Sequence, residues 1–307
     1  MVGRYADGVN RERKMFGRPP GRVKRANPNA AAAAGTLWLV VTPLVFDALG
    51  GRCELFGDDP AALAAVRAWI DRMHDRLTRF TAESELSRFN RSAGAWTAVS
   101  PELEALLRLA LDAYDQSGGL VHAGVLPALL AAGYTRDLAA GPTPRTAERV
   151  LVGPLPEVLA VRPGEARVAT GNAIDLGGLA KGWLADRAVE RIGSNALANL
   201  AGDLRATGGG PDDADGLGWP VGFGDTTVLL RDAGAATSGT TGRRWGEGLH
   251  HLIDPRTGAP AASDLVEVSV LAATATDAEV LAKTALLLGS ARGAAFLDQR
   301  ARGSFLR

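Results

Sequence analysis

The chain has 307 residues, of which 46% are hydrophobic and 22% charged, as in an ordinary soluble globular protein that is long enough to bury a core. Its 34 basic and 34 acidic side chains cancel, which argues against nucleic acid or an anionic membrane surface as the default partner. The single cysteine, Cys53, excludes an internal disulfide and a cysteine-rich zinc site.

The N-terminal segment is basic and irregular over residues 1–29, and the stretch from Ala30 to Phe46 carries no charge. A signal peptide has this pattern, but the stretch starts late and contains Pro43, and no A-x-A cleavage site closes it. It is also shorter than the roughly 20 apolar residues of a spanning helix. We therefore expect a flexible extension over residues 1–44, no stable membrane insertion and a cytoplasmic location. Export is the alternative that the apolar stretch leaves open.

The first predicted elements are a strand and a helix. Arg52 to Phe56 alternates polar and apolar residues, which is typical of a half-buried strand. Asp59 and Pro60 form a helix start, because a capping carboxylate precedes a proline at the first helical position. The residues that follow give this helix one apolar face at helical spacing: Leu63, Val66, Ile70, Met73 and Leu77.

Start and stop signals bound a second helix, which begins at Ser100-Pro101 and ends at Gly118-Gly119. Short β-rich runs follow as predicted strands at RVLVG (149–153), EVLAV (157–161) and RVAT (167–170). A third helix is predicted over residues 184–192.

The second half is predicted to consist mostly of short strands, at residues 196–200, 219–223, 227–230 and 266–271. The polar stretch 208–215 (GGGPDDAD) is interpreted as a hairpin tip, and Asp277 to Leu288 as a closing helix. Helices and strands mix without strict βαβ alternation. We therefore predict a single compact α+β domain over residues 45–307, with mixed or antiparallel sheets and packed helices.

A glycine-rich turn at DLGGLAKGWLAD (175–186) is the first candidate site. Glycines before a helix N-terminus let backbone N–H groups approach a phosphate, and Lys181 adds a point charge there. The alternative is a tight turn with an exposed lysine. The second candidate is HHLIDPRTG (250–258), which holds two of only four histidines. A type I turn with surface histidines is the alternative reading of this segment.

Several motifs occur together and in order along the chain. They are TAESELSRFN (81–90), SGGLVHAGVLPAL (117–129), DLGGLAKG (175–182), NLAGDLRATG (199–208), TSG (237–239), HHLIDPRTG (250–258) and AEVLAKTALLLG (278–289). In this combination the chain resembles the ApbE family of FAD:protein FMN transferases, from about Phe46 to its end.

The resemblance implies cleavage of FAD, transfer of FMN through its phosphate to a serine or threonine hydroxyl of an acceptor protein with a short flavinylation motif, release of AMP, and assistance by Mg²⁺. It assigns His251 and Asp254 to catalysis, with His251 as general base because imidazole titrates near neutral pH. It also implies contacts to the flavin nucleotide from eight residues: Leu49, Phe80, Leu120, Val121, His122, Asp175, Lys181 and Ile253.

The implied metal site departs from the family pattern. The resemblance assigns to the metal the carbonyl of Gly178 and the side chains at 279 and 283, where the family has an aspartate and a threonine. Here these positions hold Glu279 and Lys283. A charged ammonium cannot ligate a metal. The two residues are four apart on a predicted helix, so they share a face and can pair with each other.

Departures also occur on the flavin side, where Phe80 replaces a common tyrosine and His122 replaces an acid. Three functions therefore stay open at this point. The first is an FMN transferase with an altered metal site. The alternatives are a flavin-binding or flavin-delivery protein that has lost transfer, and an FAD pyrophosphatase that uses water as acceptor.

Overall fold

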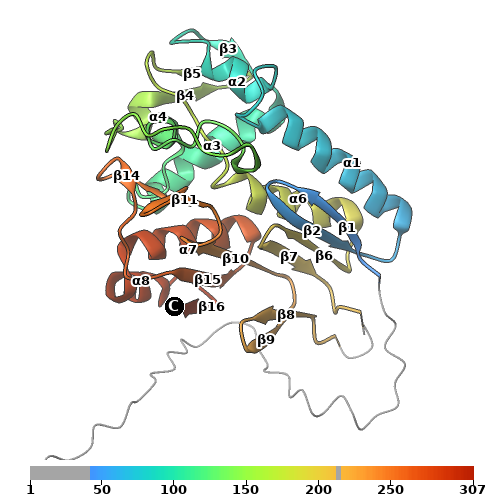
Figure 1. The fold of residues 1–307 in the computed structure, drawn as a ribbon. Coiled ribbons are helices and arrows are strands. Elements are labelled where there is room, and N and C mark those ends of the chain that lie inside the picture. The colour runs from blue at the N-terminus through green and yellow to red at the C-terminus, as the bar shows by residue number, and fades with distance from the viewer. Residues whose placement is uncertain (1–41, 212–215) are drawn as a thin grey trace, which may run out of the picture.

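The computed structural model describes residues 42–211 and 216–307. Its largest element is an antiparallel seven-stranded sheet with the strand order β1-β2-β6-β7-β10-β15-β16 (Figure 1). These strands are β1 (Leu44–Ala48), β2 (Gly51–Phe56), β6 (Ala196–Leu200), β7 (Asp203–Thr207), β10 (Ala233–Gly239), β15 (Glu267–Ala272) and β16 (Gly303–Leu306). The predicted α+β class with antiparallel pairing is confirmed.

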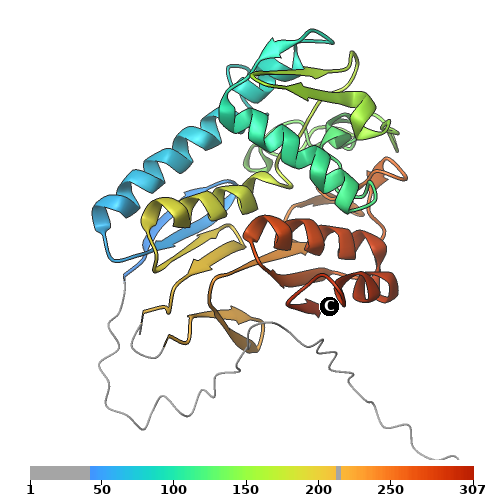
Figure 2. The same cartoon turned by 180° about the vertical axis from the view of Figure 1, so that it is seen from behind.

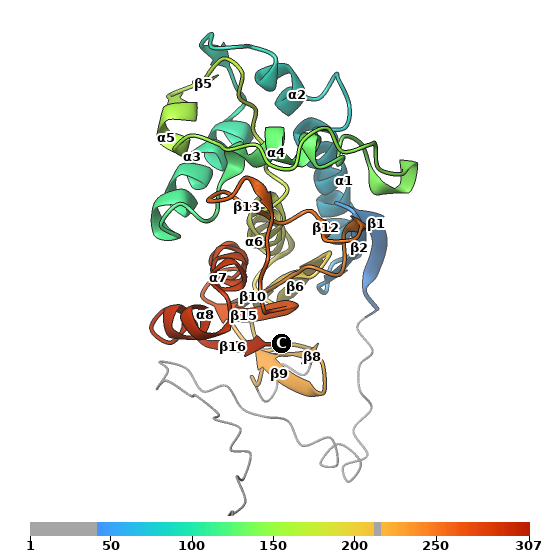
Figure 3. The ribbon, with the colours of Figure 1, turned by 60° about the vertical axis from the view of Figure 1, so that its left-hand side comes forward.

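Helices cover one face of this sheet, and a hairpin covers part of the other. The helices, which Figure 2 shows from behind, are α1 (Pro60–Leu77), α6 (Ala180–Ile192), α7 (Ala275–Leu288) and, beside α7, α8 (Ser290–Leu297). The hairpin of β8 (Trp219–Phe223) and β9 (Thr226–Leu230) packs on the opposite face, where Trp219 and Phe223 join an apolar cluster with Leu204 (Figure 3). The sheet is therefore the rigid base from which α6 and α7 project their charged side chains.

A second layer of structure lies above the sheet at the top of Figure 1. It contains α2 (Glu85–Asn90), α3 (Pro101–Gln116), α4 (Leu126–Ala131), α5 (Leu155–Val158) and a small sheet of β3 (Thr97–Ala98), β5 (Glu165–Val168) and β4 (Leu159–Arg162). Short 3₁₀ turns occur at Ala123–Val125 and Leu138–Ala140. Two small ladders, β11 (Arg244–Gly246) with β12 (Leu249–His250) and β13 (Ile253–Asp254) with β14 (Ala259–Pro260), carry the histidine motif.

The predicted helix starts are confirmed at atomic detail. The Asp59 carboxylate accepts a hydrogen bond from the Ala61 N–H at 2.8 Å, and the Ser100 hydroxyl accepts from the Leu103 N–H at 3.2 Å. The predicted apolar face of α1 is buried at Leu63, Val66, Ile70 and Met73. None of the helices in the described ranges combines the length and apolar character that a bilayer span requires.

Other predicted elements are wrong. Residues 149–153 form no strand and are held instead by a hydrogen bond from the Val150 N–H to the Gly258 carbonyl at 2.9 Å. Residues 157–161 divide between α5 and β4. The helix at 277–288 does not close the fold, because α8 and β16 follow it. The stretch 208–215 is no hairpin tip, since it joins β7 to a strand of a different sheet; its residues 212–215 lie outside the described part.

Two central strands, β7 and β10, were not predicted. β10 reads AGAATSG, whose small side chains give no alternating hydrophobic signal. The reason is the close approach of α7: a Cβ on Gly234 would lie 2.1 Å from the Ala275 nitrogen. Small residues in β10 therefore let the N-terminus of α7 lie directly on the strand. Most of the predicted N-terminal extension lies outside the described residues, and its last residue, Leu44, begins β1.

Candidate active site

A cavity of about 640 Å³ opens between the sheet and the upper layer. This volume is within the usual range for small-molecule and cofactor sites. Its lining includes every residue predicted for the site except Asp254: Leu49, Phe80, Leu120, Val121, His122, Asp175, Gly178, Lys181, His251, Ile253, Glu279 and Lys283. The fold therefore brings together at one place residues that span more than two hundred positions of the sequence.

The turn before α6 is built around Asp175. Its backbone N–H donates to the Ala123 carbonyl at 2.8 Å, and its Oδ1 accepts from the Gly177 N–H at 2.7 Å. Its Oδ2 pairs with Nε of Arg79 at 2.6 Å. These contacts leave the carboxylate oriented by backbone on one side and by a guanidinium on the other. Asp175 therefore positions Arg79 and the glycine turn at the cavity wall.

Arg79 is a site residue that the sequence reasoning missed. Its side chain is 6% exposed, and its Nη2 is a buried atom without a hydrogen-bond partner among the described residues. The guanidinium lies over the rings of Phe80 and Tyr134, at 4.3 and 4.5 Å from their centroids, and Tyr134 stacks on Trp245 at 5.0 Å. A buried donor without a partner is costly, so this wall suits a ligand that brings an acceptor.

A cluster of buried charges lies where α6 meets β7 and α7. Lys181 donates to Asp203, and its Nζ lies 3.8 Å from Oε1 of Glu279. Burial, followed by the charge of Glu279, raises the pKa of Asp203 to about 7, although Lys181 opposes this. Burial alone would lower the pKa of Lys181, but Asp203 and Glu279 outweigh it and raise that pKa. Lys181 therefore stays an ammonium, held by two acids.

Close contact between α6 and α7 fixes this cluster. Oε2 of Glu279 accepts a hydrogen bond from the Gly182 N–H at 3.0 Å and so caps the first turn of α6. Glycine is needed here, because a Cβ at 182 would lie 2.8 Å from the Ala275 carbonyl oxygen. The carboxylate of Glu279 is therefore already engaged by a backbone donor.

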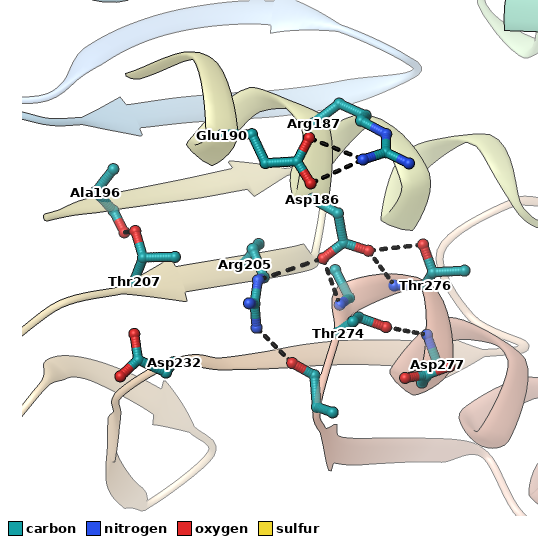
Figure 4. Close-up of polar contacts among 12 residues, drawn as sticks. Asp186, Arg187, Glu190, Ala196, Arg205, Thr207, Asp232, Thr274, Thr276 and Asp277 are labelled. Carbon is teal, nitrogen blue, oxygen red and sulfur yellow. Dashed lines mark hydrogen bonds and ion pairs between the residues drawn. The ribbon is translucent and has the colours of Figure 1, made fainter. Parts of the chain in front are cut away.

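A second set of contacts, a clamp around Asp186, joins α6 to α7 farther along α6 (Figure 4). The Asp186 carboxylate accepts from the N–H groups of Ala275 and Thr276 at 2.9 and 3.0 Å, and from the Thr276 hydroxyl at 2.7 Å. Arg205 on β7 lies 3.5 Å from the same carboxylate and donates to the Ala273 carbonyl. Burial raises the pKa of Asp186 despite these donors. The clamp sets the spacing of Lys181 on α6 from the acid and lysine on α7.

The Lys283 side chain crosses from α7 to the glycine turn, where its Nζ donates to the Gly178 carbonyl. A Cβ at 178 would lie 2.2 Å from that Nζ, so only glycine leaves room for it. The predicted pair of Lys283 with Glu279 is wrong: no ion pair within the described residues includes Lys283, and Glu279 pairs with Lys181 instead. Burial lowers the pKa of Lys283, and Glu279 partly opposes this.

His251 lines the cavity, and its Nδ1 is buried without a hydrogen-bond partner in the described part of the chain. Its backbone N–H donates to the Arg243 carbonyl at 3.2 Å. Burial, followed by the charges of Arg243 and Lys283, lowers the pKa of His251 to about 3. The imidazole is therefore neutral at physiological pH and keeps a nitrogen lone pair that a ligand proton could use.

The remaining polar residues of the motif have structural partners. His250 accepts from the Leu252 N–H at 3.3 Å through Nδ1 and contacts the Ala261 carbonyl at 3.0 Å through Nε2, so both ring nitrogens are engaged. Asp254 does not line the cavity. Its two oxygens hold Arg256 at 2.9 and 2.6 Å, and Arg256 also donates to the Leu287 carbonyl at 2.7 Å. The predicted catalytic Asp254 therefore positions the turn against the end of α7.

The predicted flavin contacts divide in a similar way. Leu120, Val121 and Ile253 supply buried apolar wall, and Leu49 lies in the β1–β2 turn with a φ of 56°. His122 lines the cavity, but its Nδ1 accepts from the Gly124 N–H and its Nε2 contacts the Gly153 carbonyl, both at 3.0 Å. Both ring nitrogens of His122 are therefore committed to the chain itself, and neither is free for a ligand.

Arg243 is the second cation that the sequence reasoning missed. It lines the cavity, and its Nη2 donates to the Leu49 carbonyl at 3.2 Å, which ties the loop before His251 to the β1–β2 turn. No ion pair of the described residues includes Arg243. The signal that could have found it is its position between two quoted motifs, TSG and HHLIDPRTG, but neither motif contains it.

Comparison with known proteins gives consistent results. A model of the ApbE family matches residues 35–305. The FAD:protein FMN transferase of Treponema pallidum (strain Nichols) is 33% identical over 271 residues, which cover 78% of this chain and 74% of the relative. The FAD:protein FMN transferase of Klebsiella pneumoniae (strain 342) is 28% identical over 271 residues, covering 80% and 82%.

Solved structures share the fold. The flavin transferase ApbE from Vibrio cholerae superposes with a TM-score of 0.70 at 21% identity, covering 86% of this chain and 96% of that one. The ApbE protein from Thermotoga maritima gives a TM-score of 0.71 at 22% identity, covering 86% and 93%. These similarities show that the chain shares the fold of those proteins.

Proposed function

The chain belongs to the ApbE family of FAD:protein FMN transferases, and we propose that its cavity binds FAD and passes FMN to a serine or threonine of an acceptor protein. The observation that carries the proposal is the convergence of almost all predicted site residues on one cavity of about 640 Å³. Its walls combine apolar groups such as Val121 and Ile253 with a few buried charges, as cofactor sites do.

Binding of the FAD pyrophosphate is supported by three cations at the cavity that keep donors for a ligand. Arg79 pairs with Asp175 through Nε, but its Nη2 is buried and unpaired among the described residues. In the same part of the chain, the side-chain hydrogen bonds of Arg243 and Lys283 go to backbone carbonyls. The N-terminus of α6 lies at the same turn, and its helix dipole favours negative charge there. The aromatic rings of Phe80 and Tyr134 beside Arg79, whose planes meet at 55°, supply apolar contact area for a ring system.

The transfer step is a displacement at phosphorus. The acceptor hydroxyl oxygen forms a bond to the phosphorus on the flavin side of FAD, and the bond from that phosphorus to the bridging oxygen breaks. AMP leaves with the electron pair, and the hydroxyl proton passes to His251. Because such reactions need mainly positioning and charge stabilisation, the buried cations and the neutral imidazole are the relevant groups.

The low pKa of His251 suits this role only when FAD is bound. In the free protein, burial and the cations Arg243 and Lys283 hold that pKa at about 3, which makes the imidazole a weak base. The bound pyrophosphate brings two negative charges. Negative charge beside an imidazole favours its protonated form, so a bound pyrophosphate raises the pKa of His251. We therefore expect His251 to be a stronger base in the FAD complex than in the free protein.

The residues expected to hold Mg²⁺ do not fit a divalent cation as they are arranged. The Gly178 carbonyl accepts from the Lys283 ammonium, and one oxygen of Glu279 accepts from the Gly182 N–H while the other faces Lys181. The described residues contain no cluster of three or more acidic, histidine or cysteine side chains suited to a metal. We therefore derive no step through a metal.

The test is mass spectrometry of a candidate acceptor domain after incubation with the protein and FAD. The expected result is a mass gain equal to one FMN, lost when the acceptor serine or threonine is replaced by alanine. FMN in place of FAD is the matched control, because it has no AMP to leave. Release of FMN and AMP without a modified acceptor would instead indicate a pyrophosphatase, and unchanged bound FAD would indicate a binding or delivery protein.

A further inference from the structure

The charged cluster at the cavity combines two lysines, Lys181 and Lys283, with two acids, Asp203 and Glu279. Both acids pair with Lys181. Asp203 accepts a hydrogen bond from the Lys181 ammonium, and Oε1 of Glu279 lies 3.8 Å from the same Nζ. Lys283 contacts no carboxylate closely and has the neutral Gly178 carbonyl as its partner. Its charge is therefore the one in this cluster that is left for a ligand.

The ammonium of Lys283 also occupies the position where a cation would have to bind. Its Nζ lies on the Gly178 carbonyl at the cavity wall, and this carbonyl is one of the groups expected to ligate a metal. A divalent ion placed there would lose the carbonyl as a ligand and would face two ammonium groups at close range. Like charges in a poorly solvated site repel by several kcal/mol at typical effective dielectrics. The lysine and a divalent ion thus exclude each other.

We propose that Lys283 is this chain's built-in replacement for the divalent cation, so that its ammonium, held on the Gly178 carbonyl, neutralises the FAD pyrophosphate without a metal. The proposal rests on the proposed function, since it names the ligand of the same cavity. Gly178 is part of the device, because any side chain there would displace the ammonium.

The electrostatics of binding agree with this role. Burial lowers the pKa of Lys283 in the free protein, which means that the ammonium is poorly solvated before a ligand arrives. A phosphate oxygen that binds there replaces the water that burial keeps from the ammonium. The resulting hydrogen bond is strong, because charge-assisted hydrogen bonds are stronger than neutral ones. A hydrogen bond to a charged group contributes enough to change affinity by about 10- to 100-fold.

The experiment is titration with FAD, followed by flavin fluorescence, in the presence of a chelator and again with excess Mg²⁺. Wild-type protein is compared with Lys283→Met, which removes the charge, and with Lys283→Thr, which frees the Gly178 carbonyl and adds a hydroxyl ligand. Arg187→Met is the control, because Arg187 is an exposed cation on α6 that pairs with Glu190 and does not line the cavity.

The wild type and Arg187→Met are expected to bind FAD with the same affinity in both media. Lys283→Met should bind 10- to 100-fold more weakly in both, whereas Lys283→Thr should bind weakly in chelator and recover with Mg²⁺. A wild-type affinity that falls by tenfold or more in chelator overturns the proposal, and this comparison needs no variant to fold.

FMN transfer measured in the same media separates this inference from the function it rests on. Transfer that occurs only with Mg²⁺ overturns the role of Lys283 and leaves the transferase in place. Metal-independent FAD binding that Lys283→Met weakens by 10- to 100-fold, without any mass gain on the acceptor, supports the lysine and overturns the transferase.

Discussion

The depressed pKa of His251 predicts a specific dependence of stability on pH. The folded-state pKa is about 3, whereas an unfolded chain has an ordinary histidine pKa of about 6.5. As the pH falls below 6.5, the imidazole of residue 251 becomes protonated in the unfolded chain but stays neutral in the folded protein. The group therefore costs stability progressively from pH 6.5 downward, and it has almost no effect above pH 7.

The magnitude follows from the two pKa values. Between pH 7 and pH 5 the linkage amounts to about 2 kcal/mol of lost unfolding free energy. The charged and titratable groups that act on the imidazole are Arg243, Lys283, His250 and Lys181, and all of them remain in a His251→Gln variant. The loss of stability between these pH values should therefore be about 2 kcal/mol smaller in that variant than in the wild type.

Urea denaturation followed by tryptophan fluorescence at pH 7 and pH 5 gives the required four free energies. His250 and His122 also have lowered pKa values because they are buried, but their contributions are common to both proteins and cancel in the comparison. Equal pH dependence in the wild type and His251→Gln would refute the burial of a neutral imidazole beside these cations. Saturating FAD should reduce the wild-type dependence, because the pyrophosphate raises the same pKa.

Further outcomes are expected from the same structure. FAD should bind more tightly than FMN in fluorescence titrations, because FMN leaves the cations near Lys283 partly unused; equal affinities would contradict the site assignment. His251→Ala should lower transfer by about 10²–10⁴-fold with FAD binding retained, whereas His250→Ala should lower the melting temperature and leave the turnover of folded protein nearly unchanged; matching losses of turnover would remove the general base. Gly182→Ala should destabilise by about 1–3 kcal/mol in urea unfolding, because its Cβ would lie 2.8 Å from the Ala275 oxygen, although the same change stabilises an ordinary helix; a stabilised variant would refute the close helix contact. Arg79→Met should weaken FAD binding by about tenfold or more, and an unchanged dissociation constant would show that its free N–H does not meet the ligand.

Local features of the sequence determined the parts of the fold that short-range chemistry controls. Asp59-Pro60 and Ser100-Pro101 start helices through contacts within three residues, and alternation over Arg52–Phe56 specifies a strand against any apolar partner. The ordered motifs likewise pointed to the cavity residues, since nearly all of them line it. β10 was not predicted, because its small residues are required by the close packing of α7 and give no local strand pattern.

The tertiary structure alone decided which polar groups are free to meet a ligand. HHLIDPRTG presents its two histidines alike in sequence, yet His250 is bound by the backbone on both ring nitrogens and His251 faces the cavity with Nδ1 unpaired. Asp254 carries the motif's acid but is turned toward Arg256. Glu279 and Lys283 share a helix face, yet they do not pair with each other. Glu279 accepts from the Gly182 N–H on α6, and Lys283 donates to the Gly178 carbonyl in the glycine turn. Side chains this long reach several alternatives, and only the packing of α6 against α7 selects among them.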